Sequence, residues 1–348
     1  MKAYVLHGPK DMRYEERPVG LVGASDALIR VRRTGICGSD VHYYSHGQIG
    51  DFVPREPFAL GHEFAGEIAE IGSDVKGFSI GDRIAVDPQL PCGECRFCRS
   101  GRYNLCTNMR FFGSASCSPH IDGGFGEYVA VPARNCYLLP EGLDYGYAAM
   151  LEPLTIATHA VMRASGNGGI AGKRLLITGA GSIGQLVLLV ARAYGASSIA
   201  VSDVEAFPRD FAISAGADFV FDPRNDEINS FAANDAIDVI IEVSGSPIAL
   251  AQSLRLVGRG GTVVQVGTQP ASVELPINLV MSKELLVVGS FRSAHVIQPA
   301  LDLAASGRIN LKPSISAVYP FAKFQEAMDA AVTKDRVIKI QVEQESVV

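Results

Sequence analysis

Four cysteines lie within one short segment of the chain, at spacings that suit the binding of one metal ion. They stand three, three and eight residues apart: Cys92, Cys95, Cys98 and Cys106. Four thiolates can surround an ion tetrahedrally and leave no position for a substrate, and Zn²⁺ is the usual ion in such closed sites. Two disulfides are the alternative, but close spacings strain most pairings and the first residues lack the apolar core of an export signal. We therefore predict a structural zinc lobe at about residues 90–110.

A second set of possible metal ligands, which leaves one position open, precedes these cysteines. The thiolate of Cys37 and the imidazole of His62 leave room for a carboxylate and for water or substrate, as in a catalytic zinc site. The carboxylate is Glu63, directly after the histidine, or Glu152, in an apolar segment where an unpaired glutamate would be costly. Tight backbone turns near the histidine are expected from three glycines: Gly61, Gly66 and Gly72. The choice between the two glutamates stays open.

A strand, a glycine-rich turn and a helix follow one another in the second half of the chain. Residues 174–178 predict a buried strand, and residues 185–194 predict the helix that the turn opens. The turn is expected to hold a dinucleotide pyrophosphate on its backbone amides, at Gly179, Gly181, Ser182, Ile183 and Gly184. Asp203 ends the next strand, where a carboxylate accepts hydrogen bonds from an adenosine ribose. Because Asp203 repels a 2′-phosphate and the following Val204 and Glu205 supply no cation, NAD is favoured over NADP.

The composition excludes several classes of protein. The chain has 348 residues, 47% of them hydrophobic, and 36 glycines, which suits two globular α/β domains. With 31 basic and 37 acidic residues, the net charge of −6 argues against a nucleic-acid partner. No apolar stretch approaches the roughly 20 residues of a membrane span, so we expect no membrane partner. Cys117 and Cys136 remain as free thiols, and seven reduced cysteines indicate a cytoplasmic protein.

The pattern of expected elements changes near Glu152. Before it, short alternating segments such as 27–32 and 64–71 are separated by glycine and proline turns, as in a small β-rich domain. After it, apolar strands such as 238–243 and 261–266 alternate with helical stretches, which is typical of a parallel sheet covered by helices. The sequence therefore predicts a β-rich domain followed by an α/β domain.

The order of these motifs resembles the zinc-dependent medium-chain dehydrogenase/reductase family over essentially the whole chain. The resemblance implies a GroES-like β-rich catalytic domain at 1–151 and a Rossmann domain, with a doubly wound parallel sheet that binds NAD, at 152–291. A return segment at 292–348 would complete the catalytic domain. The family also implies two zinc ions per chain, one catalytic and one structural, and a homo-oligomer, namely a tetramer.

The resemblance extends to residues that take part in the reaction. Ser39 and His42 match a relay that carries the substrate proton through a hydroxyl, the cofactor ribose and an imidazole, although a helix-capping serine and a surface histidine would look the same. Glu152 would also act in catalysis beside the zinc. Further cofactor contacts are implied at Val266, Gly267, Ser290, Phe291 and Arg292. A Lewis acid would lower the pKa of a substrate hydroxyl, and hydride would pass from its carbon to NAD.

Two branches of the family compete for the substrate assignment. The runs 37–44 and 152–154 resemble polyol dehydrogenases, including those for sorbitol and xylitol. The runs 109–115, 119–125 and 289–292 resemble the L-idonate 5-dehydrogenase subfamily more closely. We therefore expect a sugar acid as the substrate, with L-idonate oxidised at C5 to 5-ketogluconate, and a neutral polyol as the alternative. Non-catalytic NAD binding is a third reading, against which the complete open metal site argues.

Four side chains are expected at the substrate: Tyr43, Arg110, Phe111 and His120. A sugar acid requires a cation for its carboxylate, and an arginine can bind a carboxylate through two parallel hydrogen bonds. Arg110 and His120 are therefore the candidate cations, while Arg292 matches an arginine that also serves enzymes of neutral polyols. The alternatives are a solvated loop position for Arg110 and a place in the core for Tyr43.

Overall fold

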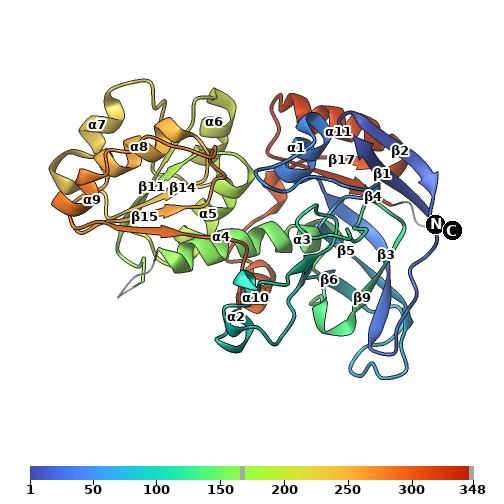
Figure 1. Cartoon of the computed structure of the whole chain (residues 1–348). Coiled ribbons are helices and arrows are strands. Elements are labelled where there is room, and N and C mark those ends of the chain that lie inside the picture. The colour runs from blue at the N-terminus through green and yellow to red at the C-terminus, as the bar shows by residue number, and fades with distance from the viewer. Residues whose placement is uncertain (165–168, 345–348) are drawn as a thin grey trace. The chain divides into compact units, whose positions relative to one another are not determined.

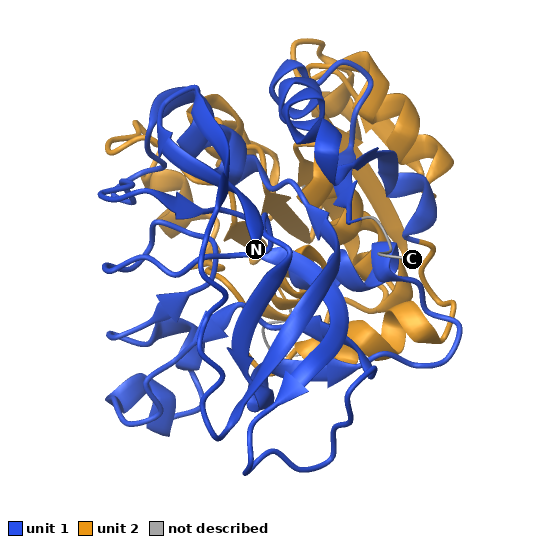
Figure 2. Cartoon of the chain, turned by 90° about the vertical axis from the view of Figure 1, so that its right-hand side faces the viewer, with its two compact units in different colours: residues 1–152, 311–348 blue, residues 153–310 orange. Residues whose placement is uncertain are grey.

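The chain folds into two compact units, shown in Figures 1 and 2. The computed structural model describes residues 1–164 and 169–344. The first unit combines Met1–Glu152 with Leu311–Val348, and the second is Pro153–Asn310. The fold is the GroES-like and Rossmann-like combination that the sequence predicts, with the last part of the chain returning to the first unit.

The return to the first unit comes later along the chain than the expected Arg292. The intervening segment contains α10 (Ile297–Ala305), which lies in the second unit and buries its apolar residues. Arg308, just after this helix, donates a hydrogen bond to the carbonyl oxygen of Ala193 in the same unit at 2.5 Å. This burial and this hydrogen bond hold the segment to the second unit.

The first unit is built around a sheet of seven strands. Six of them follow the order β10-β6-β5-β3-β18-β17, and β9 pairs with β3 beside this path. The strands of the unit are β1 (Lys2–Gly8), β2 (Asp11–Glu16), β3 (Asp26–Gly35), β4 (Phe58–Ala59), β5 (Glu63–Ile71), β6 (Arg83–Val86), β7 (Gln89–Leu90), β8 (Arg110–Phe111), β9 (Tyr128–Pro132), β10 (Cys136–Leu138), β17 (Ile315–Pro320) and β18 (Lys339–Glu343). Its helices are α1 (Gly38–His46), α2 (Arg96–Arg99), α3 (Tyr145–Ala149) and α11 (Phe324–Thr333).

The central strand β3 shows why this sheet forms and what it positions. Ala27, Ile29 and Val31 alternate along β3 and are fully buried in one hydrophobic core, the period expected of a strand with one buried face. At its carboxyl end, Gly35 pairs with Glu63 of β5 on one side and with Gln341 of β18 on the other. Segments from the beginning and the end of the chain therefore meet beside Glu63.

The second unit contains a parallel sheet of six strands in the order β13-β12-β11-β14-β15-β16. Its strands are β11 (Arg174–Thr178), β12 (Ser198–Ser202), β13 (Phe219–Phe221), β14 (Val239–Glu242), β15 (Thr262–Gln265) and β16 (Leu286–Gly289). Its further helices are α5 (Ser182–Ala193), α6 (Ala206–Ser214), α7 (Glu227–Phe231), α8 (Pro247–Leu256) and α9 (Asn278–Ser282), and α4 (Leu151–Arg163) begins at the unit boundary. The strand order runs outward in both directions from β11, so the carboxyl ends of β11 and β14 form the switch point where such sheets bind ligands.

Within the described ranges, no helix combines the length and the apolar character needed to cross a membrane.

Candidate metal and cofactor sites

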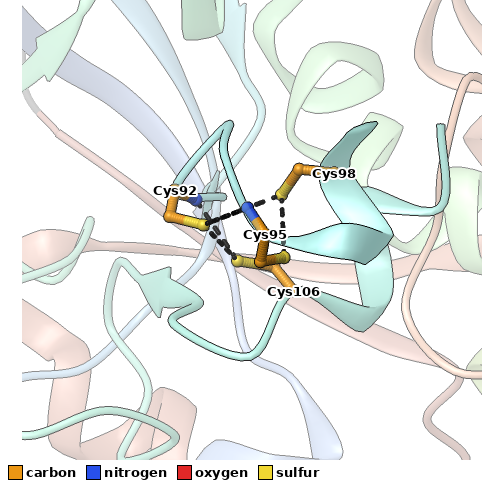
Figure 3. A group of neighbouring side chains, drawn as sticks. All are labelled: Cys92, Cys95, Cys98 and Cys106. Atoms are coloured by element: carbon orange, nitrogen blue, oxygen red, sulfur yellow. Dashed lines mark hydrogen bonds between the residues drawn. The ribbon is translucent and has the colours of Figure 1, made fainter. Parts of the chain in front are cut away.

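The four-cysteine lobe brings its sulfur atoms to the spacing of a zinc site, as Figure 3 shows. The Sγ atoms of Cys92 and Cys106 lie 3.4 Å apart, those of Cys95 and Cys98 3.5 Å, and those of Cys92 and Cys98 3.9 Å. Sulfurs at the corners of a tetrahedron around zinc would be separated by about 3.8 Å, given Zn–S bonds of about 2.3 Å. All seven cysteines are free thiols, so the disulfide alternative is wrong. Backbone N–H groups of Cys98 and Thr107 lower the pKa of the Cys95 thiol and so favour the thiolate that zinc requires.

The open set of ligands is also assembled. The ligand atoms of Cys37, His62 and Glu63 all lie within 4.8 Å of one another. Glycines make this approach possible, because a Cβ on Gly35 would lie 2.1 Å from a carboxylate oxygen of Glu63. Gly61, directly before the histidine, has φ +91, and a Cβ there would meet the ring of Phe125 at 2.6 Å. The turn predicted beside the histidine is therefore present at Gly61, whereas the turn expected at Gly66 is wrong, because this residue lies within β5 and pairs with Val31 of β3.

A buried carboxylate that the sequence analysis did not single out lies behind these ligands. Asp40 is fully buried, accepts a hydrogen bond from the backbone N–H of Cys37 at 2.9 Å, and has its other oxygen 3.7 Å from Nδ1 of His62. Burial raises the pKa of Asp40 to about 6, although His62 opposes this. Its place three residues after Cys37, at the start of α1, is the sequence signal that would have identified it.

A buried lysine from the far end of the chain completes the surroundings of Glu63. Lys339 is only 3% exposed, and its Nζ donates to both carboxylate oxygens of Glu63 at 2.7 Å and to the carbonyl oxygen of Ile36 at 3.2 Å. Burial by itself would lower the pKa of Lys339, but Glu63 and Cys37 raise it, so the ammonium stays charged. Nothing in the local sequence marks this lysine; only the pairing of β18 with β3 brings it here.

The charges of this cluster fit a bound divalent cation. Burial and the neighbouring Glu63 raise the pKa of Glu152 to about 7, although His62 and Lys339 oppose this. Glu152 lies outside the group of three ligands within 4.8 Å but interacts electrostatically with His62 and Glu63. Buried acids and a thiol thus outnumber the single ammonium of Lys339, and a zinc ion would restore the balance. Both Glu63 and Glu152 remain candidates for the carboxylate ligand.

The two residues expected to form the proton relay lie on α1. Ser39 is half-buried and His42 is exposed one turn further on, with its ring 5.4 Å from that of His46. Burial lowers the pKa of His42, and the charges of His46 and Lys334 lower it further. A neutral imidazole that can accept a proton near neutral pH suits a relay.

The residues expected at the substrate lie in different environments. Phe111 is buried, with its ring edge-on to His62 at a centroid distance of 5.8 Å. Arg110, the residue before it, is exposed on β8. Tyr43 is only 1% exposed within the core, its hydroxyl lies 3.3 Å from Oγ of Ser114, and burial raises its pKa to about 12. The alternative of a core position for Tyr43 agrees with this burial.

His120 is held within its own loop. Its Nδ1 donates to the carbonyl oxygen of Cys117 at 2.6 Å, and its Nε2 accepts from the backbone N–H of Arg55 at 2.9 Å. Its ring also packs on Phe58 at a centroid distance of 4.4 Å. With both ring nitrogens in hydrogen bonds to the main chain, His120 is less available than Arg110 to bind a carboxylate.

The residues expected at the dinucleotide follow the carboxyl ends of parallel strands in the second unit. Gly179 has φ +97, and a Cβ there would meet the backbone nitrogen of Ser244 at 2.8 Å. Gly181 caps α5 without a side-chain hydrogen bond, and a Cβ there would find no atom within 4 Å, which leaves space for a phosphate at the helix N-terminus. Both oxygens of Asp203 accept backbone hydrogen bonds, from Ala180 at 2.7 Å and from Glu205 at 2.9 Å, so its carboxylate is fixed.

The remaining expected cofactor residues lie at the same edge of the sheet. Val266 and Gly267 follow β15, and Ser290, Phe291 and Arg292 follow β16. Three buried hydroxyls of the unit have no hydrogen-bond partner among the described residues: those of Thr178, Ser182 and Ser290. Thr178 ends β11, Ser182 begins α5 and Ser290 follows β16. Unsatisfied hydroxyls at the ligand-binding edge of the sheet fit a polar cofactor.

Comparison with known proteins identifies the class that this fold and these sites define. Residues 23–141 match the family model of the alcohol dehydrogenase GroES-like domain, and residues 182–306 match that of the zinc-binding dehydrogenases. The chain belongs to the zinc-dependent medium-chain dehydrogenases.

The relatives place it among the dehydrogenases of polyols and sugar acids. Sorbitol dehydrogenase of Bacillus subtilis (strain 168) is 36% identical over 349 residues, which cover 98% of this chain and 97% of that protein. L-idonate 5-dehydrogenase (NAD(P)(+)) of Escherichia coli (strain K12) is 37% identical over 339 residues, 97% of each chain. The crystal structure of L-idonate 5-dehydrogenase from Escherichia coli K-12 gives a TM-score of 0.93 at 36% identity, over 98% of this chain and 97% of that one.

Proposed function

We propose that this protein oxidises a secondary alcohol of a sugar acid, most specifically L-idonate to 5-ketogluconate, with NAD as the hydride acceptor. The observation that carries the proposal is the assembled Cys37, His62 and Glu63 site, backed by buried Asp40 and Lys339. A neutral polyol of the sorbitol or xylitol type is the alternative, because relatives of both kinds are similarly identical. The test is kcat/KM of the zinc-loaded protein for L-idonate, sorbitol and xylitol side by side. A preference for either polyol would overturn the sugar-acid assignment.

Two zinc ions per chain follow from the two ligand sets. The four cysteines of the lobe would hold one ion for stability, and Cys37, His62 and one of Glu63 and Glu152 would hold the other. Bound at the open set, zinc supplies a Lewis acid that lowers the pKa of a substrate hydroxyl. The carboxylate of Asp40, 3.7 Å from Nδ1 of His62, would favour a positive charge at this imidazole, and Lys339 fixes the carboxylate of Glu63.

Two side chains of this protein are expected to carry away the proton of the substrate hydroxyl. In the oxidation the substrate loses the proton of its hydroxyl group. The carbon that bears this group gives up a hydride to NAD, and a carbonyl forms. Ser39 would accept the hydroxyl proton and His42, exposed on the same helix, would pass it to solvent. The pKa of His42, lowered by burial and by His46, keeps its imidazole able to accept that proton.

Asp203 is expected to decide between the two nicotinamide cofactors. The wild type should prefer NAD, and Asp203→Ser should narrow the preference by about one to two decades, because a charged hydrogen bond is worth about 1.5–3 kcal/mol. Kinetics with NAD and NADP measure this ratio. Glu227→Gln, an exposed acid on α7, is the control and should leave the ratio unchanged. Equal use of both cofactors by the wild type would contradict the assignment.

Arg110 is the candidate cation for the carboxylate of a sugar acid. Its side chain is exposed, and it is the neighbour of Phe111, whose ring lies against His62. Arg110→Ala should lower kcat/KM for L-idonate by about tenfold or more, because a charge-assisted hydrogen bond is lost, and leave sorbitol nearly unaffected. Arg134→Ala, another exposed arginine of this unit, is the control. If Arg110→Ala affects both substrates equally, the carboxylate is bound elsewhere.

The assembly and compartment are part of the proposal. Edge strand β16 exposes Leu286 at 45% and Val287 at 43%, and beyond it Phe291 is exposed at 47%. Exposed apolar side chains on an edge strand favour burial against another chain, which supports a homo-oligomer, a tetramer by family resemblance. Seven free thiols suit a reducing compartment, which supports the cytoplasm.

A further inference from the structure

A group of one acid and two arginines adjoins the turn that carries Asp203. The carboxylate of Asp222 accepts two hydrogen bonds from the guanidinium of Arg224, at 2.8 and 2.5 Å, and lies 3.5 Å from Nη1 of Arg209. Hydrogen bonds from Arg224 hold the pKa of Asp222 well below its usual range. Asp222 therefore stays ionised at neutral pH and holds both arginines.

Both arginines also touch the main chain of the expected ribose site. Arg209, on α6, donates to the carbonyl oxygen of Asp203 at 2.6 Å, and Arg224 donates to that of Val204 at 2.8 Å. The two acids follow neighbouring parallel strands: Asp203 follows β12, and Asp222 follows β13. Arg209 and Arg224 thus bring positive charge to this turn from two other segments, although the two residues directly after Asp203 carry no positive charge.

The side chains differ in their freedom to move. Arg224 is 66% exposed, whereas Asp222 is 15% exposed and Arg209 is 18% exposed. Arg224 can therefore turn toward an anion on the turn if its carboxylate partner loses its charge. Asp203 is expected to bind the ribose hydroxyls, so the 2′-phosphate of NADP is the anion that would lie near this turn.

We propose that Asp222 sets the cofactor preference by holding Arg224 and Arg209 in ion pairs, so that a 2′-phosphate meets the charge of Asp203 without an available cation. The inference rests on the proposed NAD site. Three acids and two arginines lie around the turn, and the acids are Asp203, Glu205 and Asp222. Removing the charge of Asp222 leaves two acids against two arginines and frees the Arg224 guanidinium for a bidentate contact with phosphate.

The test is the affinity of Asp222→Asn for NAD and NADP, measured by calorimetry together with kinetics. Asparagine keeps an oxygen for the backbone N–H of Arg224, which Asp222 now accepts at 3.1 Å. The ratio of NADP to NAD affinity should rise about tenfold, since one charge is removed close to the phosphate at a partly exposed site, while NAD affinity changes little. Adding Arg224→Gln to Asp222→Asn should cancel most of the gain.

Asp218→Asn is the matched control. Asp218 precedes the same strand, at its amino end, and pairs with Arg192 at 2.6 Å, so its loss removes an equal charge far from the expected ribose. The ratio of NADP to NAD affinity in Asp218→Asn should equal that of the wild type. An unchanged ratio in folded Asp222→Asn, or an equal rise in Asp218→Asn, would overturn the inference. If Asp222→Asn loses both cofactors through misfolding, Asp222→Ser takes its place with the same expectation.

The proposed function fails separately from this inference. Absence of turnover with every polyol and sugar acid would refute the enzymatic proposal, while the two cofactor affinities would still decide the role of Asp222. A wild type that binds neither cofactor would refute both.

Discussion

Cys37→Ala is expected to abolish turnover and leave a folded protein with about one zinc ion per chain. The change removes a ligand of the open set only, and the loss should reach about three decades or more, because zinc supplies several kcal/mol of transition-state stabilisation. The four-cysteine lobe should keep its ion because all the ligands expected to hold that ion remain. NADH formation and metal analysis of the same preparation measure both effects.

Two further cysteine variants serve as references. Cys117→Ala removes a half-buried thiol outside both clusters and should retain activity and two zinc ions. Cys98→Ala opens the closed lobe and should chiefly reduce thermal stability or assembly. Normal turnover by Cys37→Ala would rule out the catalytic assignment of the open set.

Lys339→Met should destabilise the first unit by about 3–5 kcal/mol, the usual effect of removing one partner from a buried ion pair. The carboxylate of Glu63 would lose both hydrogen bonds from the ammonium while it stays 1% exposed. Because the same carboxylate is a candidate ligand, zinc occupancy of the open set should fall as well. Urea unfolding and metal content measure the two effects.

Lys323→Met is the matched control for this prediction. Lys323 pairs with Glu326 at 3.3 Å, but both side chains are more than half exposed, at 57% and 60%. Such a surface pair contributes roughly 0–1 kcal/mol. If Lys339→Met is as stable as Lys323→Met and binds zinc normally, the buried pair does not support the site.

The parts of the site that could be predicted from the sequence depend on local spacing. Four cysteines in one loop must lie near one another, and a strand, a glycine turn and a helix form one connected motif, so the lobe and the turn at Gly179 follow from neighbours in the chain. The fold class follows from the alternation of strands and helices in the second half. Each of these signals stays within a short segment.

The parts that the sequence did not reveal depend on distant pairing. Lys339 reaches Glu63 only because β18 lies beside β3, and Arg224 reaches Val204 only because β13 lies beside β12. Asp40 was within reach of local reasoning, since it lies in the first turn of the helix that follows Cys37. The hydrogen bonds of His120 depend on a second loop that contains Arg55, which no local pattern indicates.

NADH formation by the zinc-loaded protein, with L-idonate, sorbitol and xylitol offered in parallel, tests the central claim most directly. NADH should form with L-idonate above all, should no longer form once a chelator has removed the zinc, and should not form with Cys37→Ala. Binding of NAD without turnover of any sugar acid or polyol, by protein that contains two zinc ions per chain, would contradict the account and favour a non-catalytic NAD-binding protein.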